Sequence, residues 1–376
     1  MTTGTTPSAP PAPPMFVRSD LIQLGGAVVA TALAGVAHYA DWPGWLAFVV
    51  AAIAVALLAS VVGLSVEQLG DRFGPGATGV LQSALGNLPE LFICLFALKS
   101  GLVGVVQAAL IGSILSNLLL VMGAAFVVGG LKHGSQSIDS GRARTISVLM
   151  IVAVTAMVFP SLTELEGAGQ AGSGAGGHEQ ALSIVISVVL LGLFALTLPA
   201  SLRKDNSTGM ADADADAPPH EAARWPVWLA VGMLAIAGLL AAFVSDWFVS
   251  ALTPAMNSWG INETFAGLVI VAIAGNAIEN VVGLQLAARN QSEYAFQIVI
   301  NSPLQIALVL APLLVILSSV LGFTALTLVF SPALVMAVFL AVLIAAVITI
   351  DGESNWIEGA SLIGVYVVIA ASFWWG

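Results

Sequence analysis

Charged residues are scarce in this chain: they make up 8% of its 376 residues, whereas a soluble domain carries roughly 25%. Hydrophobic residues make up 59%. So few charges could not cover a water-facing surface on a chain of this length, which argues against a soluble protein. The composition predicts an all-α polytopic membrane protein that lies in the lipid bilayer.

Cysteine and basic residues are also few. Cysteine occurs once, at Cys94, so no internal disulfide can form, and the sequence has no Cys or His cluster of the kind that binds metals. The net charge is -11, and ten basic residues form no patch for nucleic acid, whereas an acidic chain suits the handling of cations. No nucleophile–base arrangement, metal triad or phosphate loop supports an enzyme, and no cofactor is predicted.

Eleven apolar runs are long enough to cross a bilayer as helices, which takes about 20 residues each. They lie at roughly 21–39, 45–68, 77–99, 102–129, 144–160, 181–201, 225–249, 264–288, 293–319, 326–350 and 354–374. The segment before them, residues 1–20, begins with a stretch rich in Thr and Pro and is predicted to be a disordered tail.

The basic residues between these runs predict the orientation of the chain. If the N-terminus is cytoplasmic, the outer side holds only Lys99, and the cytoplasmic side holds Arg18, Arg72, Lys132, Arg142, Arg144, Arg203, Lys204, Arg224 and Arg289. Because cytoplasmic loops are enriched in Lys and Arg, this bias predicts a cytoplasmic N-terminus and an outer C-terminus. Short loops and a tail without targeting features favour a prokaryotic plasma membrane.

Two short polar motifs recur inside the apolar runs. Residues 86–90 read Gly-Asn-Leu-Pro-Glu and residues 275–279 read Gly-Asn-Ala-Ile-Glu, so the Gly, Asn and Glu positions are each 189 apart. Downstream, Ser113 and Ser302 each follow the glutamate of their motif by 23 residues. A shared offset at four positions indicates a duplicated unit.

The motifs fall in the third and eighth runs, which are five spans apart, so the two units cross the membrane in opposite directions. The predicted domains are an extra helix at 21–44, a first inverted five-helix repeat at 45–203, an acidic cytoplasmic linker at 204–224 and a second repeat at 225–376. Secondary transporters commonly have this plan, with the site at the midplane between the repeats.

Glu90 and Glu279 are the candidate centre of the site. An ionised carboxylate deep in a bilayer costs several kcal/mol, and neither motif offers a basic partner. Each glutamate can instead be protonated, or the two can share a cation. A site that alternates between these states is a proton/cation exchanger, whereas the simplest alternative is a pair of permanently neutral structural acids.

Further polar and helix-breaking residues surround the two carboxylates. The amides Asn87 and Asn276 and the polar groups of Ser113, Asn117, Ser302 and Gln305 are candidate oxygen ligands, or polar contacts between helices. Gly86, Pro89 and Gly275 are expected to break their helices, which frees backbone carbonyls for a cation. Glu67 and Glu263, near the ends of their spans, are possible entry acids.

The first motif region, 86–123, contains Gly-Asn-Leu-Pro-Glu-Leu at 86–91 and Gly-Ser-Ile-Leu-Ser-Asn at 112–117, and it closely resembles the first alpha repeat of the Ca²⁺/H⁺ antiporters, a branch of the cation/Ca²⁺ exchanger superfamily. The second, 275–312, resembles the family's second repeat, although Asn280 stands where the family usually has histidine. The span count and the acidic linker match as well.

The resemblance implies that Glu90 and Glu279 bind Ca²⁺ as the transported substrate and exchange it for protons. The favoured mechanism for this exchange is alternating access. It also implies that the third, fourth, eighth and ninth spans line the site. A Na⁺/H⁺ or Na⁺/Ca²⁺ exchanger on the same scaffold is the first alternative. A cation channel is a second, and one carboxylate in each of two inverted halves favours a carrier over it.

Overall fold

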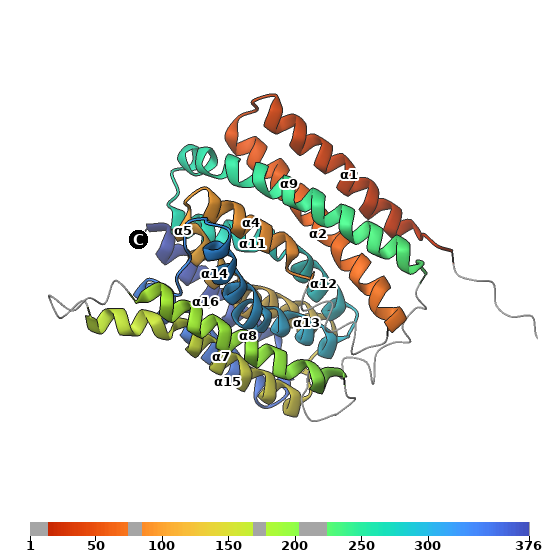
Figure 1. Ribbon diagram of the computed structural model, residues 1–376. Coiled ribbons are helices and arrows are strands. Elements are labelled where there is room, and N and C mark those ends of the chain that lie inside the picture. The colour runs from red at the N-terminus through yellow and green to blue at the C-terminus, as the bar shows by residue number, and fades with distance from the viewer. Residues whose placement is uncertain (1–13, 74–84, 168–177, 203–223, 376) are drawn as a thin grey trace, which may run out of the picture.

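The computed structural model describes residues 14–73, 85–167, 178–202 and 224–375, and nearly all of its elements are helices (Figure 1). In chain order they are α1 (Arg18–Tyr39), α2 (Gly44–Phe73), α4 (Leu88–Lys99), α5 (Val103–Leu115), η1 (Ser116–Val121), α6 (Met122–His133), β1 (Gln136–Ser137), α7 (Ser140–Gly167), α8 (Glu179–Leu202), α9 (Val227–Trp259), α10 (Glu263–Phe265), η3 (Ala266–Val271), α11 (Ala272–Gly275), α12 (Ala277–Ala288), α13 (Ser292–Gln305), η4 (Ile306–Leu310), α14 (Ala311–Val320), α15 (Pro332–Thr349), β2 (Glu353–Ser354) and α16 (Trp356–Trp375). The all-α prediction is confirmed.

Nine helical stretches among the described residues are long and apolar enough to cross a membrane. A bent pair, Glu263–Gly275 and Glu279–Ala288, adds a tenth if its halves, which meet at 60°, form one span. Ten of the eleven apolar runs therefore correspond to helices. The other run, 77–99, is described only from residue 85, so the count of eleven stays a prediction.

The helices pack in three groups (Figure 1). α1, α2 and α9 lie together on one side of the molecule, and α7, α8 and α15 lie on the opposite side. Between them lie α4, α5 and α11–α13, the segments that carry the two polar motifs. The largest apolar cluster of small and branched side chains runs through all three groups, so the motifs sit inside the bundle.

In the part of the chain that the structure describes, three π-helical segments, η1, η3 and η4, interrupt the central helices. η1 joins α5 to α6, and η4 joins α13 to α14, so each of these spans is continuous. Pro303 lies inside α13 and does not end the helix. η3 packs directly on α5, where a Cβ at Gly112 would overlap the backbone of Leu268. π-helical turns are rare and are frequently found at functional sites, so this part of the bundle is a candidate for one.

Residues 325–330, which we call the strap, are not helical, although the tenth span was predicted to begin at 326. Leu326, Leu328 and Phe330 are buried in alternation, and their N–H groups donate to serine hydroxyls of α14, α8 and α7 at 3.0, 3.0 and 2.8 Å. The side chain of Gln107 on α5 donates to the carbonyls of Thr327 and Val329. Side chains thus supply the backbone hydrogen bonds that a helix would otherwise make, and α15 begins only at Pro332.

Replacing Gln107 with leucine is expected to destabilise the protein, because it leaves two strap carbonyls without their donor. Buried groups left unsatisfied cost about 1–3 kcal/mol, so the variant should unfold at a lower temperature in detergent. Gln180→Leu is the matched control, since Gln180 donates to Ser319 at an exposed position. Equal unfolding temperatures for the two variants would contradict this role of Gln107.

Ion pairs join segments far apart in the sequence. Arg224, at the end of the predicted linker, pairs with Asp20 at 3.2 Å, and both side chains are nearly buried. α1 accordingly begins at Arg18, inside the segment predicted to be a disordered tail, while residues 1–13 and most of the linker lie outside the described residues. Arg142 of α7 pairs with Glu293 of α13 at 3.1 Å, which ties the first half of the chain to the second.

Candidate ion-binding site

The two motifs adopt the same backbone conformation. Asn87 has φ −92° and ψ 16°, Asn276 has φ −100° and ψ 21°, and a helix of 12 residues begins directly after each. Both helices end before a residue with positive φ, Gly101 at 80° and Asn290 at 63°. These positions also differ by 189, so the offset seen in the sequence extends to the backbone.

Each motif places its glutamate in the first turn of a helix, where the helix dipole favours a carboxylate. Gly86 and Asn87 form a turn before α4, and Gly275 ends α11 at the bend before α12. Pro89 was expected to break its helix but lies in the first turn of α4, where proline is tolerated because its missing N–H has no partner there. The asparagines do not cap their helices, which leaves their amides for other partners.

Asn276 is the hub of a buried hydrogen-bond network. Its Nδ2 donates to Ser113 Oγ at 2.8 Å and to the carbonyl of Ala272 at 2.9 Å. Its Oδ1 accepts from Asn117 Nδ2 at 2.9 Å and from Ser302 Oγ at 3.3 Å. Because a carbonyl can only accept, Ala272 fixes the orientation of the amide. The Asn276 amide therefore has all four of its hydrogen bonds and is 1% exposed.

Glu90 ends this network and is incompletely bonded. Ser113 Oγ donates to Glu90 Oε1 at 2.5 Å, while Oε2 is buried and has no partner among the described residues. The side chain is 1% exposed. A Cβ at Gly275 would lie 3.4 Å from Glu90 Cγ, so the two motifs meet at this carboxylate. A buried carboxylate with a free oxygen can hold a proton or a cation there.

Glu279 is only partly buried, and its carboxylate lies near its own backbone N–H. It is close enough to Glu90 for the two charges to interact. In the part of the chain that the structure describes, neither glutamate forms an ion pair. Asn87 Nδ2 contacts Gln305 Oε1 at 3.5 Å, a longer bond than those made by Asn276.

The two possible entry acids lie outside this network. Glu67, on α2, is exposed, and Glu263 is exposed at the start of α10, where its carboxylate faces Gly104 of α5.

Sequence reasoning missed two features of the site. Asn280 has a buried Oδ1 without a partner in the described segments, and Ser116 faces the Tyr366 hydroxyl. The repeat offset could have identified Ser116, because it lies 189 positions before the candidate ligand Gln305. No motif or spacing in the sequence pointed to Tyr366.

Almost all the polar groups gathered here can act as oxygen ligands of a cation: two carboxylates, several amide oxygens and two serine hydroxyls. Hard cations such as Ca²⁺ and Na⁺ prefer such ligands, and a pair of carboxylates matches a divalent charge. The arrangement can therefore bind either protons or a cation. Asn276 Oδ1 accepts from two donors here, so it can bind a cation only after those bonds break.

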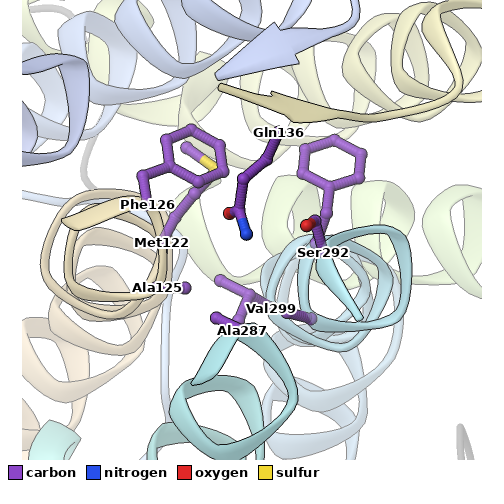
Figure 2. A pocket seen from close by; sticks show the side chains of 9 residues that line it. Met122, Ala125, Phe126, Gln136, Ala287, Ser292 and Val299 are labelled. Carbon is purple, nitrogen blue, oxygen red and sulfur yellow. The ribbon is translucent and has the colours of Figure 1, made fainter. Parts of the chain in front are cut away.

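A separate small pocket lies between α6, α12, α13 and β1, and none of its lining residues belongs to the network (Figure 2). The amide of Gln136 points toward its centre, and the other lining side chains are mostly apolar. Gly129 makes room for this amide, because a Cβ there would overlap it. The pocket offers no ligand set for an ion and is part of the packing between the halves.

Comparison with known proteins decides the family. The profile described as "Sodium/calcium exchanger protein" matches residues 43–202 and 229–375. The chain belongs to the sodium/calcium exchanger family. Among family relatives, the "Ca(2+)/H(+) antiporter ChaA" of Bacillus subtilis is 37% identical over 333 residues, covering 88% of this chain and 93% of the relative. The "Ca(2+)/H(+) antiporter" of Aphanothece halophytica is 34% identical over 349 residues, covering 89% and 92%.

Solved structures agree with this family assignment. The structure of native YfkE is 33% identical, has a TM-score of 0.78, and is matched over 94% of this chain and 100% of its own. The crystal structure of the "H+/Ca2+ Exchanger CAX" has a TM-score of 0.72 at 17% identity, over 95% of this chain and 92% of its own, and supports the fold alone. The sodium/calcium exchanger fold is therefore shared over nearly the whole chain, and the membership expected from the two motifs is confirmed.

Proposed function

We propose that this protein is a secondary transporter that exchanges Ca²⁺ for protons across a membrane, with Glu90 and Glu279 shared between the two ions. Relatives more than 30% identical over most of the chain carry the name Ca²⁺/H⁺ antiporter. The observation that carries the proposal is the buried Glu90 carboxylate with one oxygen unpaired, at the place where the two motifs meet.

The unpaired oxygen explains why protons and Ca²⁺ compete. A charged carboxylate without a partner is strongly unfavourable in a low-dielectric interior, so it takes up either a proton or a cation. Glu279 offers the second carboxylate, and serine and amide oxygens complete an all-oxygen ligand set of the kind that Ca²⁺ prefers. Two protons for one Ca²⁺ would keep the charge of the occupied site constant.

Alternating access supplies the transport cycle. On one face, the deprotonated glutamates bind Ca²⁺, and the two inverted halves then rearrange so that the site opens to the other face. There, protons replace Ca²⁺ and neutralise the carboxylates, and the protonated carrier returns. The distribution of basic residues favours a cytoplasmic N-terminus, so the expected direction in a prokaryotic plasma membrane is Ca²⁺ efflux driven by the proton gradient.

Purified protein in liposomes with an acidic lumen tests this function. External ⁴⁵Ca²⁺ should enter as protons leave, and the lumenal pH should rise by the equivalent of two protons per Ca²⁺. Na⁺ should compete weakly. Sodium flux against protons without Ca²⁺ flux would overturn the choice of substrate, and Ca²⁺ flux without any change of lumenal pH would overturn the coupling.

A further inference from the structure

One member of the network has no counterpart in the other repeat. The offset of 189 pairs Glu90 with Glu279 and Ser113 with Ser302, but it pairs Asn117 with Ile306, which is buried and apolar. The two residues occupy nearly the same place in the helices, because η1 begins one residue before Asn117 and η4 begins at Ile306. The site is therefore asymmetric at this position.

Asn117 joins the two halves of the chain. Its Nδ2 donates to the Ser113 carbonyl at 3.0 Å, which fixes the amide orientation because a carbonyl can only accept. The same group donates to Asn276 Oδ1 at 2.9 Å and approaches Ser302 Oγ at 3.3 Å. Both of these partners belong to the second half, and all three residues named with Asn117 are buried.

The hydrogen bonds around the two motif asparagines are unequal as a result. Asn276 is saturated and buried, whereas the side chain of Asn87 is partly buried and, among the described residues, has the one contact at 3.5 Å to Gln305. If the halves exchange conformations during transport, the contacts of Asn276 pass to Asn87. Ile306 then stands where Asn117 stands here and has no amide to donate.

We propose that Asn117 is a one-sided latch, a positioning residue that stabilises the conformation described here and has no equivalent in the opposite-facing one. The inference rests on the proposed function and on the inverted arrangement of the repeats. This role differs from that of a Ca²⁺ ligand. The Asn117 Nδ2 group donates to the second half and thereby stabilises one of the two conformations of the carrier.

The latch predicts effects of opposite sign on the two faces of the membrane. Loss of one or two net hydrogen bonds shifts a two-state equilibrium by about tenfold. Apparent affinity is the intrinsic affinity multiplied by the fraction of carriers open to that face. Removing the latch therefore lowers the half-saturating Ca²⁺ concentration on one face and raises it on the other, so that their ratio changes about tenfold.

The experiment measures proton-coupled ⁴⁵Ca²⁺ flux from each face, in right-side-out and inside-out vesicles, for the intact chain and for two variants. Asn117→Ile installs the residue of the other repeat. Asn117→Leu has nearly the shape of asparagine and no donor, and it keeps the test decisive if the β-branched isoleucine variant does not fold. Ser245→Ala, at a buried serine of α9 outside the network whose hydroxyl has no partner among the described residues, is the control and should leave the ratio unchanged.

Opposite shifts on the two faces, with a ratio changed about tenfold in both variants, support the latch. If Asn117 is only a ligand, both substitutions weaken Ca²⁺ binding on both faces by the same factor and the ratio stays constant, which overturns the latch. Absence of Ca²⁺ flux in the intact chain overturns the proposed function itself, so the two failures are distinguishable.

Discussion

Replacing Glu90 with glutamine is expected to reduce proton-coupled Ca²⁺ transport at least about 100-fold. Glutamine has nearly the same shape, and its carbonyl oxygen can still accept from Ser113, so the network and the fold should survive. The charge that attracts Ca²⁺ is lost, together with the proton that replaces it. Breaking a buried charge interaction costs about 3–5 kcal/mol, which corresponds to a factor of at least about 100.

The measurement is ⁴⁵Ca²⁺ uptake into liposomes with lumenal pH followed at the same time. Glu279→Gln should lose both signals as well. Glu353→Gln is the matched control, because Glu353 is an exposed acid of β2 outside the network. Rates within twofold of the intact chain for Glu90→Gln, in protein that remains monodisperse, would show that this carboxylate does not carry the exchanged ions.

Replacing Gly112 with alanine is expected to destabilise the protein by about 1–3 kcal/mol, the usual cost of overpacking a core. A Cβ at Gly112 would overlap the carbonyl and Cα of Leu268, and one at Gly267 would overlap the carbonyl of Val105. α5 and η3 are thus in backbone contact, and this contact sets the distance between Ser113 and Asn276. Since backbone atoms cannot rotate away, the two helices must separate.

Thermal unfolding in detergent, together with ⁴⁵Ca²⁺ flux, measures both consequences. Gly112→Ala should unfold earlier and transport slowly even below its unfolding temperature, because the Ser113–Asn276 hydrogen bond is stretched. Gly192→Ala and Gly238→Ala are controls in helices with no atom within 4 Å of the new Cβ. These should be neutral or slightly stabilising, since alanine favours helix by up to about 1 kcal/mol over glycine. Similar behaviour of all three variants would rule out the close contact.

Apolar run length was sufficient to predict ten of the helical stretches, because a helix in lipid satisfies its own backbone and only its length and side chains matter. The strap shows where this reasoning fails. Residues 325–330 are as apolar as the helix that follows, and their hydrogen-bond partners come from four other helices. Nothing within the run itself indicates that serines such as Ser161 and Ser183 will supply those bonds.

The sequence predicted which residues form the site better than it predicted the hydrogen bonds that join them. The motif offset identifies Glu90, Ser113, Asn276 and Ser302, and the structure joins these four by hydrogen bonds. The central role of Asn276 could not be predicted, because it depends on the Ala272 carbonyl and on how α5 crosses α11. The roles of these residues in transport stay predictions until ion flux is measured.

The strap also constrains how the chain can assemble. Three of its four partner helices, α5, α7 and α8, come from the first half, while the strap itself belongs to the second. A second half inserted alone would leave the amides of Leu328 and Phe330 facing hydrocarbon, at a cost of several kcal/mol each. The second half therefore depends on side chains of the first half for its own backbone hydrogen bonds, and a second half expressed alone is expected to be unstable.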